Sequence, residues 1–337
     1  LVYAGHGAHE RPYHRLLQME ATQQNCQDER VRPPKNSVAH AAAALLISLL
    51  LAVGAHGATS QSGDDRPYAP PLWQVTNAEH TAYLLGSIHF GDTTMYPLPA
   101  TTAAAIESAQ TIAVEIDLHS VTANEQRRVV RRYGVLPQGQ KLSTQVGEVV
   151  WTKVTESCRE LALDCAQLEP LRPWLAALRL AVKAISTAGY DASKGVDQFI
   201  MQRMAQKAKI VALETFEGQI SLMASIDGAG GRIFMDETAQ SIEEVREQLD
   251  GLFAAWRVGD DRALDRFLNN EFRDSRINGI YDAMIVNRNK RMAQKIDILL
   301  RQNQRLMVVV GAAHLVGPDS IPKLLEGSGW ALKRVSP

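Results

Sequence analysis

The sequence has no excess of charge of either sign and no apolar run long enough to mark an unambiguous membrane span. Among its 337 residues, 36 lysines and arginines stand against 37 aspartates and glutamates. No net positive field is therefore present to hold a nucleic-acid backbone. With 45% hydrophobic and 22% charged residues, the composition is that of an ordinary folded protein and excludes disordered, collagen-like and coiled-coil classes. We expect a globular protein with no nucleic-acid partner.

Several well-known catalytic motifs are also missing. The sequence contains no G-x-S-x-G, C-x-x-C, H-E-x-x-H, P-loop or G-x-G-x-x-G pattern. These motifs are typical of many serine hydrolases, thiol redox and zinc sites, classical zinc peptidases, and nucleotide- or dinucleotide-binding enzymes. The sequence therefore gives no support to those classes.

The longest uncharged apolar segment, Ala41–Val53, lies near the N-terminus and has 13 residues. Basic residues precede it and small residues follow it, which is typical of a secretory signal peptide. A membrane anchor needs roughly 20 apolar residues, so we interpret 35–58 as a cleavable signal, with an uncleaved anchor as the alternative. Residues 1–34 are interpreted as a doubtful leader or over-extended start, and 59–71 as a linker. The pattern predicts a periplasmic or secreted protein that meets the membrane only through an uncleaved signal.

Two cysteines, Cys158 and Cys165, follow this segment. In an exported protein such a pair suggests a disulfide. Within one continuous helix the two residues would be about 10 Å apart along the axis, beyond the limit of about 7 Å between bridged Cα atoms. A disulfide therefore requires the helix to end between them, which residues 162–170 would allow. Two unpaired thiols are the alternative.

Strand-like patterns gather at both ends of the remaining chain. A hairpin is predicted from 72–76 and 81–85, and further strands are predicted at 112–116, 210–213, 306–310 and 332–335. Helical patterns cover 101–110, 149–163, 173–186, 196–207, 237–257, 260–272 and 286–302. We predict an α/β domain over 72–337, with a central mixed sheet built from both ends of the chain and mostly helical insertions at about 119–195 and 228–280.

Two of the four histidines in this domain share one local pattern. An apolar strand ends in glycine, and a histidine follows three residues later: Gly86 precedes His89, and Gly311 precedes His314. Glycine permits φ > 0 and close backbone approach, so each histidine would reach the carboxyl end of the sheet, where α/β proteins bind ligands. We predict that these pseudo-repeated strand-GxxH elements bring two imidazoles to one crevice.

Two histidines are an incomplete metal site, and a carboxylate is the usual third ligand. Glu115 is the leading candidate because it stands within the apolar strand pattern of 112–116, where a buried carboxylate needs a cation or several donors. Asp117 is the alternative, and His119 is a weaker third imidazole. The predicted ligands of a divalent Mn, Co or Zn ion are His89, Glu115 and His314.

Two further charged residues are candidates for catalysis. Glu214 follows the strand at 210–213 and would serve as a second carboxylate that accepts a proton, or as the N-cap of the next helix. Arg288 opens the helix that leads into the second histidine strand. It would bind a substrate anion or a developing oxyanion, or else lie on the helix surface as a solvated cation.

The order of these segments resembles the TraB/GumN family, which includes the Tiki-type metalloproteases. The resemblance rests on the two GxxH elements and the V-E-I-D segment Val114–Asp117. Shorter matching segments are Tyr96–Pro99, Gly195–Asp197, Leu213–Thr215, Asn287–Asn289 and Gly329–Trp330. It implies a core akin to the erythromycin-esterase-like and ChaN-like folds. It also implies a metal-dependent active site at His89, Glu115 and His314, with Arg288 matching the family's arginine.

Taken together, the sequence predicts an exported, divalent-metal-dependent hydrolase that is peptidase-like and acts on a peptide or small-molecule substrate. The predicted catalytic residues are His89, Glu115, Glu214, Arg288 and His314. The alternatives are a non-catalytic periplasmic protein that binds haem or a peptide, and an accessory protein for envelope or polysaccharide assembly.

Overall fold

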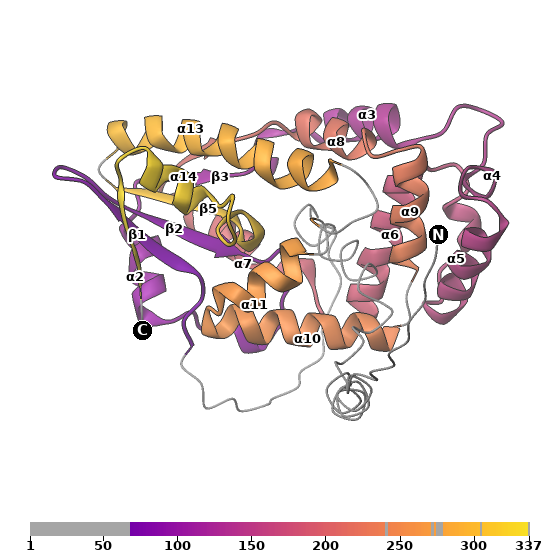
Figure 1. The fold of residues 1–337 in the computed structure, drawn as a ribbon, viewed down its shortest axis with the longest axis horizontal. Helices are drawn as coiled ribbons and strands as arrows, with labels where there is room; N and C mark the ends of the chain where they lie inside the picture. Colours follow the sequence, from indigo (N-terminus) through magenta and orange to yellow (C-terminus); the bar gives the residue numbers. More distant parts are fainter. Residues whose placement is uncertain (1–67, 240–241, 271–272, 274–278, 304, 336–337) are drawn as a thin grey trace, which may run out of the picture. The chain divides into compact units, whose positions relative to one another are not determined.

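A six-stranded mixed sheet is the centre of the computed structural model (Figure 1), which describes residues 68–335 except 240–241, 271–272, 274–278 and 304. The predicted leader at 1–34, the signal at 35–58 and most of the linker at 59–71 lie outside the described residues. The strands are β1 (Leu72–Thr76), β2 (Thr81–Ser87), β3 (Thr111–Val114), β4 (Lys209–Ala212), β5 (Leu306–Gly311) and β6 (Ala331–Arg334). The predicted mixed sheet built from both ends of the chain is confirmed.

The strand order is β4-β3-β5-β2-β1-β6. Strands β2 and β3 both pair with β5 in parallel, and β4 pairs with β3 in parallel. Strand β1 pairs antiparallel with β2, as the predicted hairpin requires, and also with β6. The apolar run of β5 is buried along its whole length, as expected for a strand with neighbours on both sides. Because β2, β3, β4 and β5 point the same way, their carboxyl ends share one edge of the sheet, which we call the carboxyl edge.

Helices fill the connections between these strands. They are α2 (Ala100–Ser108), α3 (Ala123–Gly134), α4 (Leu142–Val146), α5 (Glu148–Glu160), α6 (Pro173–Thr187), α7 (Val196–Met204), α8 (Phe216–Ala224), α9 (Ala229–Thr238), α10 (Ile242–Val258), α11 (Asp261–Asp265), α13 (Asn287–Gln302) and α14 (Ile321–Gly327). In Figure 1, α13 runs above the strands, and α10 and α11 run below them. Helices α3 to α6 fall in the first predicted insertion and α9 to α11 in the second, and α6 packs against both α9 and α10.

Two predicted helices differ from the structure. The predicted helix at 237–257 corresponds to the end of α9 and to α10, which begins only at Ile242. The predicted helix at 260–272 is α11 followed by a π-helical turn, Arg266–Asn270. A second π-helical turn, Asp282–Val286, precedes α13. Among the described helices, none combines the length and the apolar character needed to cross a membrane.

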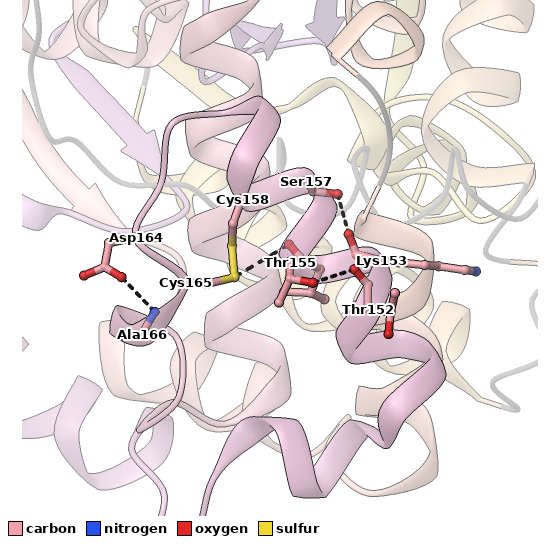
Figure 2. Close-up of a disulfide and its surroundings, with 9 residues drawn as sticks. Thr152, Lys153, Thr155, Ser157, Cys158, Asp164, Cys165 and Ala166 are labelled. Atoms are coloured by element: carbon pink, nitrogen blue, oxygen red, sulfur yellow. Dashed lines mark hydrogen bonds between the residues drawn. A yellow bond between two sulfur atoms is a disulfide. The ribbon is translucent and has the colours of Figure 1, made fainter.

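The two cysteines form a disulfide (Figure 2). Helix α5 ends at Glu160, and Ala162 takes a positive φ of 51°, so the chain turns back before Cys165. This turn brings the Cα atoms of Cys158 and Cys165 to 5.7 Å, within the range that a disulfide allows. The predicted disulfide and the predicted end of the helix between the two cysteines are therefore confirmed, and the alternative of two unpaired thiols is wrong.

Candidate functional site

The structure brings the five predicted site residues together at the carboxyl edge. His89 lies two residues after β2, Glu115 directly after β3, Glu214 two residues after β4, and His314 in the short 3₁₀ turn after β5. Arg288 is the second residue of α13. Parallel strands that end side by side place these side chains in one region, as the GxxH pattern predicts.

In the first GxxH element, glycine is needed for space and not for a special backbone angle. Neither Gly86 nor Gly311 has a positive φ. A Cβ atom on Gly86 would lie 3.1 Å from the Cα atom of Ala312, because the end of β2 packs closely on the turn after β5. The predicted close approach is therefore present, but the sharp positive-φ turn is not.

Glu115 is a buried carboxylate with three donors. Its Oε1 atom accepts from the backbone N–H of Gly311 at 2.7 Å, and its Oε2 atom accepts from Arg288 Nη2 at 2.5 Å and Gln219 Nε2 at 3.1 Å. Burial alone would raise the pKa of Glu115. The charge of Arg288, with smaller contributions from His314, His89 and the Gly311 N–H, outweighs burial and lowers the pKa to about 2. Glu115 is therefore anionic at neutral pH.

His314 is fully buried and has a defined tautomer. Asn289 donates from Nδ2 to the Asp319 carbonyl at 2.8 Å, which turns its Oδ1 atom towards His314 Nδ1 at 2.6 Å. An amide oxygen only accepts, so the imidazole proton is on Nδ1. Burial and the nearby Arg288 charge lower the pKa of His314 to about 4, so the ring is neutral at pH 7 and Nε2 carries a lone pair. Within the described residues this Nε2 atom has no hydrogen-bond partner.

His89 is oriented by a carboxylate. Its Nδ1 atom lies 3.0 Å from Oδ2 of Asp197, the second residue of α7. The start of α7 is joined to the end of β2 by the Val196 N–H, which donates to the Ile88 carbonyl at 2.9 Å. Any side chain at Gly195 would overlap the His89 carbonyl group. Since a carboxylate accepts hydrogen bonds, this contact places a proton on Nδ1 of His89 and directs Nε2 to the opposite side.

The three predicted metal ligands border one small space next to Gly311. An atom at the position of a Gly311 Cβ would lie 3.2 Å from Glu115 Oε1, 3.8 Å from His314 Cδ2 and 3.9 Å from His89 Nε2. His314 Nε2 is 3.7 Å from Glu115 Oε1. Two imidazole nitrogens and a carboxylate oxygen are a donor set that suits a divalent ion. The buried Nε2 atom of His314, which has no hydrogen-bond partner in the described part of the chain, fits that use.

His89, Glu115 and His314 are not spaced as the ligands of a bound metal ion would be. Among the residues that the structure describes, no three His, Cys, Asp or Glu side chains are placed to hold a metal ion together. The physical reason is that the oxygens of Glu115 make their close contacts with Arg288, Gln219 and the Gly311 N–H. The assignment of His89, Glu115 and His314 as metal ligands therefore stays a prediction.

Arg288 is a buried bridge between two glutamates. Its side chain is 1% exposed, so the interpretation as a surface cation is wrong. Nε and Nη2 donate to Glu214, Nη2 also donates to Glu115, and Nη1 donates to the Met284 carbonyl at 3.4 Å. Because these donors are already engaged, the geometry does not favour the predicted contact with a substrate oxyanion.

Glu214 belongs to the same bridge. The N-cap of α8 is Thr215, whose hydroxyl accepts from the Gly218 N–H at 3.1 Å, so the interpretation of Glu214 as that cap is wrong. Burial would raise the pKa of Glu214, but the charge and hydrogen bonds of Arg288 outweigh it and lower the pKa. A carboxylate held in this way is a weak proton acceptor. Its position favours a role in holding Arg288.

A pocket of about 50 Å³ opens beside these groups. Its ionisable lining residues are His89, Glu115, His119 and Asp197, and apolar side chains that include Met201 form much of the rest of the wall. His119 is exposed at this pocket. Asp117, the alternative ligand, instead caps the short turn at Leu118–Ser120 by accepting from the His119 N–H at 3.1 Å.

Sequence reasoning missed three residues that orient the site: Asp197, Gln219 and Asn289. Asp197 and Asn289 could have been identified from the sequence, because they belong to the segments Gly195–Asp197 and Asn287–Asn289 that carry the family resemblance. Gln219, which donates to both Glu115 and Glu214, had no signal in the sequence.

Comparison with known proteins confirms the resemblance. The sequence model of the TraB/PrgY/gumN family matches residues 71–334, which contain every residue of the site. The chain belongs to the TraB/PrgY/gumN family. Among similar TraB/PrgY/gumN proteins, "Uncharacterized protein YbaP" of Shigella flexneri is 24% identical over 246 residues, covering 73% of this chain and 88% of YbaP. YbaP of Escherichia coli (strain K12) is also 24% identical, over 72% of this chain and 87% of its own length. No solved structure gives a significant match.

Proposed function

We propose that this TraB/PrgY/gumN protein is an exported, divalent-metal-dependent hydrolase whose substrates are peptides. The observation that carries the proposal is the Nε2 atom of His314, a buried lone pair without a partner among the described residues, 3.7 Å from an anionic carboxylate. An unsatisfied buried polar atom costs about 1–3 kcal/mol. A cation that accepts this lone pair would recover that cost.

The neighbours of the two imidazoles support the same proposal. Metal-ligating histidines commonly donate their second ring N–H to a carboxylate, carbonyl oxygen or water, which fixes the ring and its tautomer. Asp197 stands in this relation to His89, and Asn289 to His314. Together with the charge that Arg288 preserves on Glu115, these contacts fix the tautomers of both rings beside one anion, an arrangement that suits a divalent ion.

Three residues would bind the metal ion, and a fourth would transfer protons. His89, Glu115 and His314 would hold the ion, which when bound supplies Lewis acidity that polarises a carbonyl group and makes water a stronger acid. Of the four ionisable residues lining the pocket, His89 is paired with Asp197, and Glu115 is held by Arg288. His119 is thus the group placed to move a proton between the pocket and solvent.

The disulfide supports the export part of the proposal. Disulfides form and persist in oxidising compartments and are rare in the cytosol. The Cys158–Cys165 bridge agrees with the secretory pattern of the apolar segment Ala41–Val53.

Haem binding at His89 is less well supported than hydrolysis. Pockets for ligands of drug size measure roughly 300–1,000 Å³, whereas the pocket beside His89 offers about 50 Å³. That space suits an ion, a water molecule and part of a peptide group. We therefore keep hydrolysis as the proposed function.

Metal analysis of the purified protein tests the proposal. Wild type should carry close to one divalent ion per chain, and the double variant His89→Ala/His314→Ala should carry almost none. His80→Ala is the matched control, because His80 precedes β2 and lies at the edge of the sheet opposite the carboxyl edge. Equal metal content in wild type and the double variant would refute the site.

A second measurement tests the hydrolase assignment itself. Wild type should cleave members of a peptide library, lose this activity on addition of a chelator and regain it when Mn, Co or Zn is restored. The double variant should be inactive under all three conditions. Cleavage that a chelator does not change would contradict the role of the ion.

A further inference from the structure

A second and larger hollow lies next to the pocket. It has a volume of about 480 Å³ and lies between the end of β4, helix α8 and helix α13. Leu213, Glu214, Thr215 and residues of α8 form one side of this groove, and Arg291 and Lys295 of α13 form the other. We call it the α8–α13 groove.

The cations of the groove continue a row that begins inside the site. Arg288, Arg291 and Lys295 are separated by three and four residues and therefore share one face of α13. With a rise of 1.5 Å per residue, Arg291 stands about 4.5 Å and Lys295 about 10.5 Å beyond Arg288 along the helix axis. Arg288 is bound to Glu115 and Glu214, so the row leads outward from the candidate metal ligands.

The two cations that line the groove, Arg291 and Lys295, form no ion pair with any residue that the structure describes. Glu214, the one carboxylate among the described residues of the groove lining, shares Arg288 with Glu115. Lys295 donates to the Leu213 carbonyl oxygen, which is uncharged. Arg291 is exposed and has no ion pair or hydrogen bond among the described residues. The groove therefore presents a guanidinium group and an ammonium group, neither of which is ion-paired within the described part of the chain.

The groove and the pocket meet at one side chain. Gln219 lines both, and its amide donates to Glu115 at 3.1 Å and to Glu214 at 2.9 Å. Gln219 is itself buried, so a peptide with one part in the pocket and the next part in the groove would pass over the wall that this side chain helps to form. A peptide spans about 3.3–3.6 Å per residue, so a carboxylate within one to three residues of the bond at the pocket would reach the row of cations.

We propose that the α8–α13 groove binds a carboxylate of the peptide substrate, with Arg291 as its principal partner. A guanidinium group suits this role because its paired N–H donors match the two oxygens of a carboxylate. This inference rests on the proposed function, since it makes the groove a specificity subsite of the same hydrolase. The carboxylate belongs either to the C-terminus of the peptide or to an aspartate or glutamate side chain.

Peptide binding to the full chain tests the proposal. The probes are three pentapeptides of one sequence that carry an uncharged BODIPY label: an amidated form with asparagine, the same form with aspartate, and the asparagine form with a free C-terminal carboxylate. Fluorescence anisotropy is measured with chelator present, so that no metal-dependent cleavage occurs. Wild type should bind at least one of the two anionic peptides about 5- to 10-fold more tightly than the neutral one, as expected for a charge-assisted contact. The anionic peptide that is preferred identifies the source of the carboxylate.

Variants of α13 test whether the preference for anionic peptides arises in the α8–α13 groove. Arg291→Gln should reduce it to less than twofold, and Arg291→Lys should retain part of it. Lys290→Gln is the matched control, because Lys290 is the preceding residue of α13, is exposed and does not line the groove, and it should keep the wild-type preference. An unchanged preference in Arg291→Gln, or equal binding of all three peptides by wild type, would overturn the proposal.

The failure of the subsite and the failure of the hydrolase are distinguishable. If wild type shows an Arg291-dependent preference but no chelator-sensitive cleavage, the groove binds carboxylates and the hydrolase assignment is wrong. If cleavage depends on metal but the kcat/KM ratio of anionic to neutral peptides is the same in wild type and Arg291→Gln, the hydrolase stands and the subsite is wrong.

Discussion

Replacing Arg288 by methionine should lower the free energy of unfolding, and this loss should be larger at pH 7 than at pH 5. Arg288 is 1% exposed and neutralises two buried carboxylates. The pKa of Glu115 falls from 4.5 to about 2 in the folded protein, which corresponds to about 3 kcal/mol of stability at neutral pH. Removing one partner of a buried ion pair costs about 3–5 kcal/mol. We therefore expect Arg288→Met to lower the free energy of unfolding at pH 7 by about 3–5 kcal/mol.

The pH dependence follows from the direction of the pKa shifts. In wild type, the contribution of Glu115 is complete above about pH 4.5 and is lost as the pH falls towards 2. It is thus constant between pH 7 and pH 5. In Arg288→Met, Glu115 and Glu214 are buried without their cation, so their pKa values should rise above the ordinary value. Protonation at lower pH then removes the cost of burying the two negative charges. The stability difference between the two proteins should therefore be largest at pH 7 and smaller at pH 5.

Urea unfolding followed by tryptophan fluorescence measures this difference, with Trp174 and Trp256 as buried reporters. A chelator in every sample keeps metal binding from contributing to stability. Arg301→Met is the control on the same helix, because Arg301 forms an exposed pair with Asp297 and should cost less than about 1 kcal/mol. The reasoning is refuted if Arg288→Met loses less than 1 kcal/mol at pH 7, or if its deficit does not shrink by pH 5.

Three further variants test separate parts of the structure. Gly311→Ala should keep the unfolding free energy within about 1 kcal/mol of wild type, because φ −52° and ψ 139° suit alanine. It should lower bound metal, since its methyl group would lie 3.2 Å from Glu115 Oε1; full metal content would speak against the space beside Gly311. Asp197→Asn should weaken metal binding about 10- to 100-fold in a Co²⁺ titration, and an unchanged dissociation constant would remove Asp197 as an orienting group. Cys158→Ser/Cys165→Ser should lower the unfolding free energy by about 2–3 kcal/mol in urea unfolding and leave metal content unchanged, because α5 carries no residue of the site.

The sheet was predictable because its signals are local. The uninterrupted apolar run of β5 and the paired runs of β1 and β2 each specify a strand without reference to distant residues. The end of β3 was not predictable in this way. The apolar pattern continues to Ile116, but the strand ends at Val114, and the N–H group of Gly311 donates to the carboxylate of Glu115. Glu115 thus follows the strand with its carboxylate bound to a residue 196 positions away, a contact that the local apolar pattern does not reveal.

The same distinction applies to the candidate site. His89 and His314 were predictable because the backbone of a strand end positions the residues that follow it. Their partners come from distant parts of the chain: Asp197 is 108 residues from His89, and Arg288 is 173 residues from Glu115. A single sequence contains no periodicity that links such positions. For this reason Arg288 could equally be interpreted as a surface cation, and Gln219 gave no signal.

The charge balance of the buried network connects the stability of the fold with the proposed ion. Arg288 contributes one positive charge against the two negative charges of Glu115 and Glu214, and His314 adds none at neutral pH because its pKa is lowered to about 4. One buried negative charge is therefore in excess, which is costly in an apolar interior. A divalent ion between His89, Glu115 and His314 would offset that excess, so binding should stabilise the fold, by about 2.7 kcal/mol when free metal is 100 times its dissociation constant. The added metal should raise the urea midpoint of unfolding in wild type and leave it unchanged in His89→Ala/His314→Ala. That result would show that an ion bound by the two histidines compensates the negative charge of Glu115.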